Sequence, residues 1–123
     1  GVQGKTLAVW GLSFKPDTDD VRSAPSLEII EELHKKGASI RGYDPIVKDV
    51  LPDVITHVPS AEEALKGADA LMLCTEWNEF GEWEPQKIAA TLSGKYVFDG
   101  RNVFDPNTMK KAGLVYSSIG RTS

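Results

Sequence analysis

Gly11-Leu12-Ser13-Phe14-Lys15-Pro16-Asp17-Thr18-Asp19-Asp20-Val21-Arg22 is a polar stretch between two regular elements, and its position indicates the fold. An apolar run, Thr6-Leu7-Ala8-Val9-Trp10, precedes it, and an amphipathic stretch begins near Ser23. A strand, a loop and a helix in this order place the loop at the carboxyl end of a strand. Open α/β sheets bind their ligands at that edge, so residues 11–22 are the first place to expect a site.

The loop favours an anion as its ligand. Lys15 and Arg22 are fixed cations, and the loop leads into the positive end of a helix. It is not a dinucleotide-binding turn, because it has one glycine and the bulky Phe14 and Pro16. A phosphate held by side chains fits better than a pyrophosphate held by bare backbone. The alternatives to anion binding are that Lys15 is a solvated side chain above Phe14 and that Arg22 forms a local salt bridge.

Strand and helix signals alternate along the whole chain. The expected strands are Thr6–Gly11, Ser39–Asp44, Val54–Val58, Ala70–Thr75, Tyr96–Asp99 and Leu114–Ser117. Several of them, including Tyr96-Val97-Phe98, are apolar on both faces, as in buried parallel strands. Four helices are expected: one that ends at Gly37, one that opens with Ser60 and Glu63 and ends at Gly67, one that runs from Pro85 towards Gly94, and one that opens at Asp105 and Pro106. A weak turn of helix is also expected around Ile46–Leu51.

This alternation predicts an α/β fold: a Rossmann-like three-layer sandwich with a mainly parallel sheet of about six strands. We expect the strand order 3-2-1-4-5-6. In that order the loops after the first and fourth strands face each other at the switch point of the sheet.

Composition bounds the class of protein. The 123 residues fit a single domain, and 41% hydrophobic with 26% charged residues is ordinary for a globular protein. A net charge of −4 argues against nucleic acid as a partner, and no apolar run is long enough for a membrane span. The single Cys74 excludes an internal disulfide and suits a reducing compartment, so we expect the cytoplasm.

Further along the chain, Asp99-Gly100-Arg101-Asn102 follows the fifth strand and directs Arg101 to the same sheet edge as Lys15. Arg101 is either a phosphate clamp or a surface arginine paired with Asp99 or Asp105. The aromatic residues of 75–80 either stack on a base or seal the sheet end. Cys74 is expected in the core. No Ser-His pair, poised carboxylate pair or metal cluster emerges, so we expect no catalytic residue and no metal site.

Five ordered motifs carry a resemblance to a known family. They are Gly11–Pro16, Thr18–Ser26, Tyr43-Asp44-Pro45, Thr75-Glu76-Trp77 and Asp99–Asn102. Together they resemble the C-terminal, UDP-binding domain of the UDP-glucose 6-dehydrogenase family, from about Gly4 to Gly120. The resemblance implies that residues 1–123 are one UDP-sugar-binding domain of a larger, homo-oligomeric enzyme. In that family UDP-glucose is oxidised to UDP-glucuronate with two NAD+, and NAD is bound mainly by an N-terminal domain of the same chain.

By position, the resemblance implies that Phe14, Lys15 and Arg101 contact the nucleotide sugar and that Arg22 reaches the NAD phosphates. It also implies that the catalytic cysteine lies outside these residues, so the domain alone is inactive. Cys74 matches a strand position and not that nucleophile. Two alternatives stay open: a related UDP-N-acetyl-sugar or GDP-mannose dehydrogenase domain, and a free-standing, non-catalytic nucleotide-binding module. A Rossmann-like cofactor binder is disfavoured by the absent glycine fingerprint.

Overall fold

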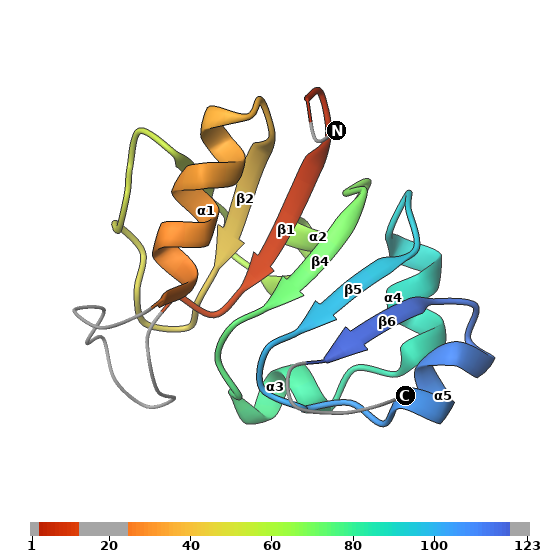
Figure 1. Ribbon diagram of the computed structural model, residues 1–123. Coiled ribbons are helices and arrows are strands. Elements are labelled where there is room, and N and C mark those ends of the chain that lie inside the picture. Colours follow the sequence, from red (N-terminus) through yellow and green to blue (C-terminus); the bar gives the residue numbers. More distant parts are fainter. Residues whose placement is uncertain (1–2, 13–24, 119–123) are drawn as a thin grey trace.

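The computed structural model describes residues 3–12 and 25–118. Within these residues lie six strands: β1 (Thr6–Trp10), β2 (Ser39–Tyr43), β3 (Ile55–His57), β4 (Ala70–Leu73), β5 (Tyr96–Asp99) and β6 (Val115–Ser118). They form one sheet in the order β3-β2-β1-β4-β5-β6, and every neighbouring pair is parallel (Figure 1). The predicted fold class and strand order are therefore confirmed.

The helices of the described residues are α1 (Pro25–Lys35), α2 (Ala61–Leu65), α3 (Asn78–Gly81), α4 (Pro85–Thr91) and α5 (Pro106–Lys111). Two starts follow the predicted capping chemistry. The Ser60 hydroxyl accepts a hydrogen bond from the Glu63 amide at 3.1 Å, and the Asp105 carboxylate accepts one from the Thr108 amide at 2.9 Å. These caps satisfy amides that the first turn of a helix leaves without an intrahelical partner.

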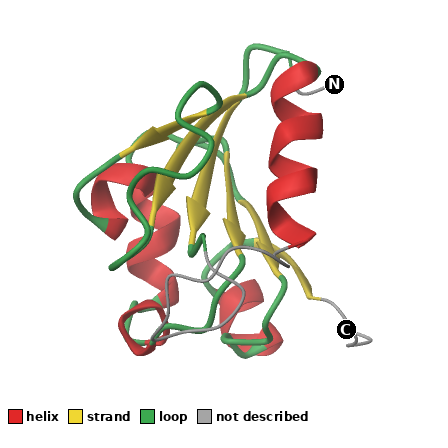
Figure 2. Ribbon diagram, turned by 90° about the vertical axis from the view of Figure 1, so that its left-hand side faces the viewer, coloured by secondary structure: helices red, strands yellow, loops and turns green. Residues whose placement is uncertain are grey.

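The helices cover the two faces of the sheet unequally (Figure 2). On one face, Ile30 of α1 packs with Val9 of β1 and Ile40 of β2. On the other face, α2, α4 and α5 contribute Leu65, Ile88 and Met109 to a larger core. Within the described residues, no helix is long and apolar enough to cross a membrane.

Two local expectations were wrong, and one helix is slightly shorter than expected. Residues 46–51 form no helix, because the Asp44 carboxylate takes the amides of Ile46 and Val47, both at 2.8 Å, into a turn. The helix that begins at Pro85 stops at Thr91, because the next amides turn to another partner: Ser93 and Gly94 both donate to the Ala68 carbonyl. The run Tyr96-Val97-Phe98 is not buried on both faces, since Tyr96 and Phe98 are 49% and 47% exposed.

Candidate functional site

The carboxyl ends of the strands meet at one edge of the sheet, which lies at the arrowheads in Figure 1. The strand order reverses between β1 and β4, so the segments after these strands flank the switch point of the sheet. The described chain beyond β1 is Gly11 and Leu12, and the segment beyond β4 is Cys74 to Trp77. In open α/β sheets, ligands bind at the switch point beyond the carboxyl ends of the strands.

A close backbone approach joins the two sides of the switch point. Gly11 has φ of +95°, and a Cβ atom built on it would lie 2.5 Å from the Cβ of Thr75. Thr75 is fully buried, and the Gly11 amide donates to the Tyr43 carbonyl at 2.8 Å. The loop that starts at Gly11 therefore leaves the sheet along a path open to glycine alone.

Asp44 holds the next residue of this loop. Its side chain is 2% exposed, and its Oδ2 atom accepts a hydrogen bond from the Leu12 amide at 2.8 Å. Its Oδ1 atom accepts those of Ile46 and Val47. One buried carboxylate therefore satisfies three backbone amides and ties the end of β1 to the end of β2.

Asp99 organises the turn after β5 in the same way. Its side chain is buried and accepts hydrogen bonds from the amides of Arg101 (2.9 Å) and Phe104 (3.0 Å). The Tyr116 hydroxyl donates to the same carboxylate at 2.6 Å. These bonds fix the backbone at Gly100 and Arg101, and hence where the arginine side chain starts.

The Arg101 side chain turns towards β4. Its Nε donates to the Cys74 carbonyl at 3.1 Å and lies 3.7 Å from Glu76 Oε2. The sequence left open a pairing with Asp99 or Asp105. The Asp99 carboxylate accepts the Arg101 backbone amide, and the guanidinium reaches across to the neighbouring strand end. The structure thus brings Arg101 to the switch point.

Phe14, Lys15 and Arg22, the other predicted site residues, lie outside the described residues. Their predicted convergence with Arg101 stays a prediction. Two residues, Asp44 and Asp99, were not singled out from the sequence as side chains that accept hydrogen bonds from the amides of these loops. The signal was present, because each aspartate closes a strand and precedes a proline or glycine, the usual setting of a side chain that caps a turn.

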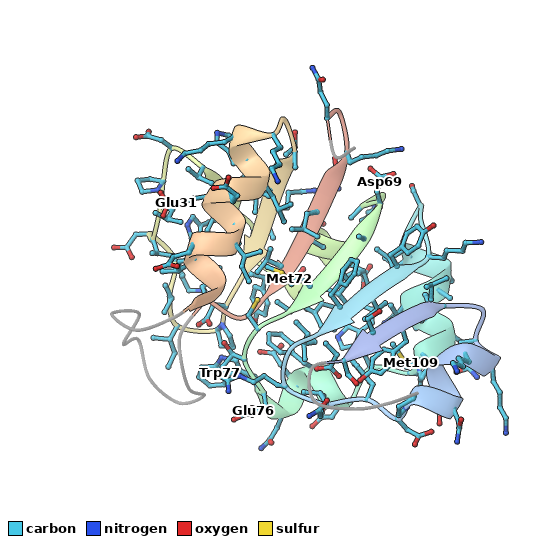
Figure 3. All side chains as sticks on the ribbon, viewed as in Figure 1. Glu31, Asp69, Met72, Glu76, Trp77 and Met109 are labelled. Carbon is cyan, nitrogen blue, oxygen red and sulfur yellow. The ribbon has the colours of Figure 1, made fainter. Side chains whose placement is uncertain are left out.

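Glu76 and Trp77 lie together below the end of β4 (Figure 3). The sequence assigned the aromatic residues here either to a base or to sealing the sheet. Phe80 is fully buried and stacks on Trp10 with ring centroids 5.1 Å apart, so it seals the sheet end. Trp77 packs against the same core, and its buried Nε1 has no hydrogen-bond partner among residues 3–12 and 25–118.

Tyr43, at the end of β2, has a perturbed hydroxyl. Burial, together with the hydrogen bond that this hydroxyl donates to Glu79 Oε1 at 3.0 Å, raises the pKa of Tyr43 to about 12. Tyr43 is therefore protonated and a hydrogen-bond donor throughout the physiological range. Cys74, expected in the core, is only partly buried at the end of β4. Residues 3–12 and 25–118 hold no group of three side chains suited to a metal ion.

The fold and this edge define a class: a doubly wound, parallel α/β domain that presents an arginine at its switch point. The profile of the UDP-glucose/GDP-mannose dehydrogenase family, UDP binding domain, matches residues 8–106. The chain belongs to this family, and the match covers its UDP-binding domain.

Relatives and solved structures agree with this assignment. A UDP-glucose 6-dehydrogenase of Bacillus subtilis is 42% identical over 98% of this chain and 28% of its own length. A UDP-glucose 6-dehydrogenase of Pseudomonas aeruginosa is 41% identical over 97% of this chain and 28% of its own length. The chain thus spans a little over a quarter of these proteins.

Among solved structures, an NDP-N-acetyl-D-galactosaminuronic acid dehydrogenase from Methanosarcina mazei matches with a TM-score of 0.84 and 29% identity, over 98% of this chain and 25% of that one. A UDP-D-ManNAc dehydrogenase from Pyrococcus horikoshii matches with a TM-score of 0.77 and 28% identity, over 98% of this chain and 26% of that one.

Proposed function

We propose that this chain is the substrate-binding domain of a longer, NAD-dependent UDP-glucose 6-dehydrogenase, which oxidises UDP-glucose to UDP-glucuronate. The choice of UDP-glucose is supported by the curated relatives at 42% and 41% identity, both named for that substrate. The solved structures named for N-acetyl sugars are more distant, at 28% and 29% identity.

The observation that carries the proposal is the placement of Arg101. Two hydrogen bonds define its position: the buried Asp99 carboxylate accepts one from its backbone amide, and the Cys74 carbonyl, at the end of β4, accepts one from its Nε. A guanidinium so oriented presents a planar, permanently charged group to an anion, and a nucleotide sugar carries two phosphates. We assign Phe14 and Lys15, from the loop after β1, to the same substrate.

NAD does not fit this domain as its main site. The turn after β1 has a single glycine, Gly11, whose Cβ position is filled by Thr75, and the residues after it are bulky. We assign the cofactor to another domain of the longer protein, with Arg22 lending charge to its phosphates, and the catalytic cysteine to the same absent part. We expect the longer protein to be a homo-oligomer.

Calorimetric titration of the 123-residue chain tests the substrate. UDP-glucose is expected to bind more tightly than UDP-N-acetylmannosamine or GDP-mannose, and weakly, because one domain encloses only part of the ligand. Arg101→Ala is expected to weaken binding by about one to two decades, the loss of one charge-assisted hydrogen bond. Arg41→Ala removes a partly exposed arginine of β2, whose Nη1 donates to the Glu63 carbonyl, and serves as the matched control.

Equal binding of all three nucleotide sugars would contradict the choice of UDP-glucose. An effect of Arg41→Ala as large as that of Arg101→Ala would contradict the site. Mass spectrometry of the native gene product separates the remaining alternative, because a product of about this chain's own mass would mean a free-standing nucleotide-binding module.

A further inference from the structure

Arg101 has an acidic neighbour on the strand end that it reaches. Its Nε lies 3.7 Å from Glu76 Oε2, which is too far for a hydrogen bond and is an attraction between charges. The hydrogen bond of the same Nε goes to the Cys74 carbonyl at 3.1 Å. Glu76 follows β4 and lies beside Trp77 at the carboxyl edge of the sheet (Figure 3). The guanidinium that we assign to the phosphates of the substrate therefore has a carboxylate at its side.

This ion pair adds little to the stability of the fold. The side chains of Arg101 and Glu76 are 30% and 47% exposed, and ion pairs with that access to water are screened. Two hydrogen bonds already hold the arginine, one from its amide to Asp99 and one from its Nε to Cys74. The main effect of Glu76 is therefore on the electrostatic field that a ligand meets at the guanidinium.

Two other carboxylates at the ends of strands, Asp44 and Asp99, act on a ligand far less. They are 2% and 1% exposed, and each accepts hydrogen bonds from backbone amides. The dipoles of those amides offset the carboxylate charges. Glu76 is half exposed, so its charge acts directly on an anion bound by Arg101.

The loop after β1 does not reverse this balance of charge. It brings Lys15 and Arg22 together with Asp17, Asp19 and Asp20, so three carboxylates stand against two cations. The whole chain has a net charge of −4. A site of this composition suits a ligand of low negative charge that is held by specific contacts, and it lacks the excess of positive charge that attracts every polyphosphate.

We propose that Glu76 is a specificity-determining residue, whose charge makes the site favour nucleotide sugars over free uridine nucleotides. This inference rests on the proposed function, in which Arg101 binds the diphosphate of a UDP-sugar. Both phosphates of a nucleotide sugar are diesters with one charge each. The terminal phosphate of UDP or UTP is a monoester and carries close to two charges above about pH 7. The additional charge of the free nucleotide lies on a phosphate, and Glu76 repels it there.

The distance between the groups sets the size of this repulsion. A phosphate oxygen bonded to Arg101 lies about 3 Å from the guanidinium, and Glu76 Oε2 lies 3.7 Å from Nε, so the phosphate is within about 10 Å of the carboxylate. This separation is close to the Debye length at about 0.1 M salt, so the two charges still interact. In a partly hydrated site, one additional charge on the ligand then changes binding by about threefold.

Competition kinetics of the longer enzyme test the proposal, with UDP and UTP as inhibitors against UDP-glucose. The buffer is at about pH 8 and free of magnesium, which would otherwise neutralise the phosphates. Glu76→Gln is expected to lower the Ki of UDP by about threefold more than the KM of UDP-glucose, and the Ki of UTP by at least as much. At about 1 M salt, where the Debye length is about 3 Å, this difference from the unmodified enzyme is expected to disappear.

Glu82→Gln is the matched control, because it removes the same charge at the exposed end of α3. It is expected to leave the ratios of Ki to KM unchanged. Equal shifts in the two variants would overturn the proposal, since net charge would then account for the effect. A uniform rise of both Ki values and the KM in Glu76→Gln would also overturn it, because Glu76 would then only position Arg101. Unchanged ratios would show that the Glu76 charge does not act on the bound phosphates.

A failure of the proposed function has a different signature. An enzyme that oxidises another nucleotide sugar would contradict the choice of UDP-glucose alone. The same comparison is then made between that sugar nucleotide and its free nucleotide. A shift of about threefold in their ratio on Glu76→Gln would keep the role of Glu76, and an unchanged ratio would overturn it as well.

Discussion

Gly11 lies directly against Thr75, at the point where the ends of β1 and β4 meet. A Cβ atom on Gly11 would fall 2.5 Å from both the Cβ and the Oγ1 of Thr75 and 2.7 Å from its backbone nitrogen. Real Cβ atoms do not approach that closely, and φ of +95° is unfavourable for any other residue. The switch point of this sheet is therefore closed by direct contact of a backbone and a buried side chain.

The first prediction follows from this contact. Gly11→Ala is expected to lower the free energy of unfolding by about 3–4 kcal/mol, because it adds a steric clash to the cost of positive φ. Gly113→Ala is the control: its φ of +89° is similar, but no atom of the described part of the chain lies within 4 Å of its Cβ position. It should cost about 1 kcal/mol. Urea denaturation measures both, and equal losses would mean that the contact with Thr75 relaxes freely.

Asp44 provides the second prediction. Asp44→Ala leaves the amides of Leu12, Ile46 and Val47 without their acceptor, so we expect a loss of about 3 kcal/mol in the free energy of unfolding. Asp49→Ala, at an exposed position of the same loop, is expected to change it by less than about 0.5 kcal/mol. Similar denaturation midpoints for the two variants would show that water replaces the Asp44 carboxylate without cost.

The third prediction concerns pH. Because the pKa of Tyr43 rises from 10.0 to about 12 on folding, the stability it confers is fully present below pH 10. Between pH 10 and about 12 the unfolded chain loses this proton and the folded chain keeps it, so stability falls as pH rises. Phenolate absorbance of the native protein minus that of Tyr43→Phe should titrate near pH 12. A difference curve centred at the ordinary value would contradict the role of burial and Glu79.

The fourth prediction assigns Arg101 and Arg22 to different substrates of the longer enzyme. Arg101→Ala is expected to raise the KM for UDP-glucose by about one to two decades, and Arg22→Ala to act mainly on the NAD+ dependence. Steady-state kinetics with each substrate varied in turn measures both. Should Arg22→Ala affect only UDP-glucose saturation, or Arg101→Ala only NAD+ saturation, the assignment of the two loops would be reversed.

The fifth prediction is that the 123-residue chain alone has no dehydrogenase activity. Hydride transfer needs a bound nicotinamide cofactor, and the family resemblance places both the cofactor site and the nucleophile elsewhere. The assay is NADH formation from UDP-glucose and NAD+ by the purified chain. The longer protein is the positive control, and NADH production by the isolated chain would refute the division of the enzyme into domains.

Local patterns were sufficient for most of the elements. Apolar runs located the strands, and the side chains of Ser60 and Asp105 marked helix starts because capping is a bond between residues three apart. The missed helix α3 begins after Trp77, with no side-chain cap to signal it. The expected turn of helix near residue 46 failed because Asp44 bonds those amides first.

The sequence by itself determined the positions of the strands and hence the α/β class, since hydrophobic periodicity and turn residues act over a few positions. The strand order and the sheet edge at which Arg101 lies were predicted from the topology that alternating strands and helices usually adopt. Tertiary structure alone decided which way Arg101 turns, because its Nε partner is the carbonyl of Cys74, 27 residues away. It also decided that Gly11 must meet Thr75 and that Phe98 stays exposed. Contacts between strands depend on how the crossovers bring distant segments together, and no local pattern records which face of a strand another element will cover.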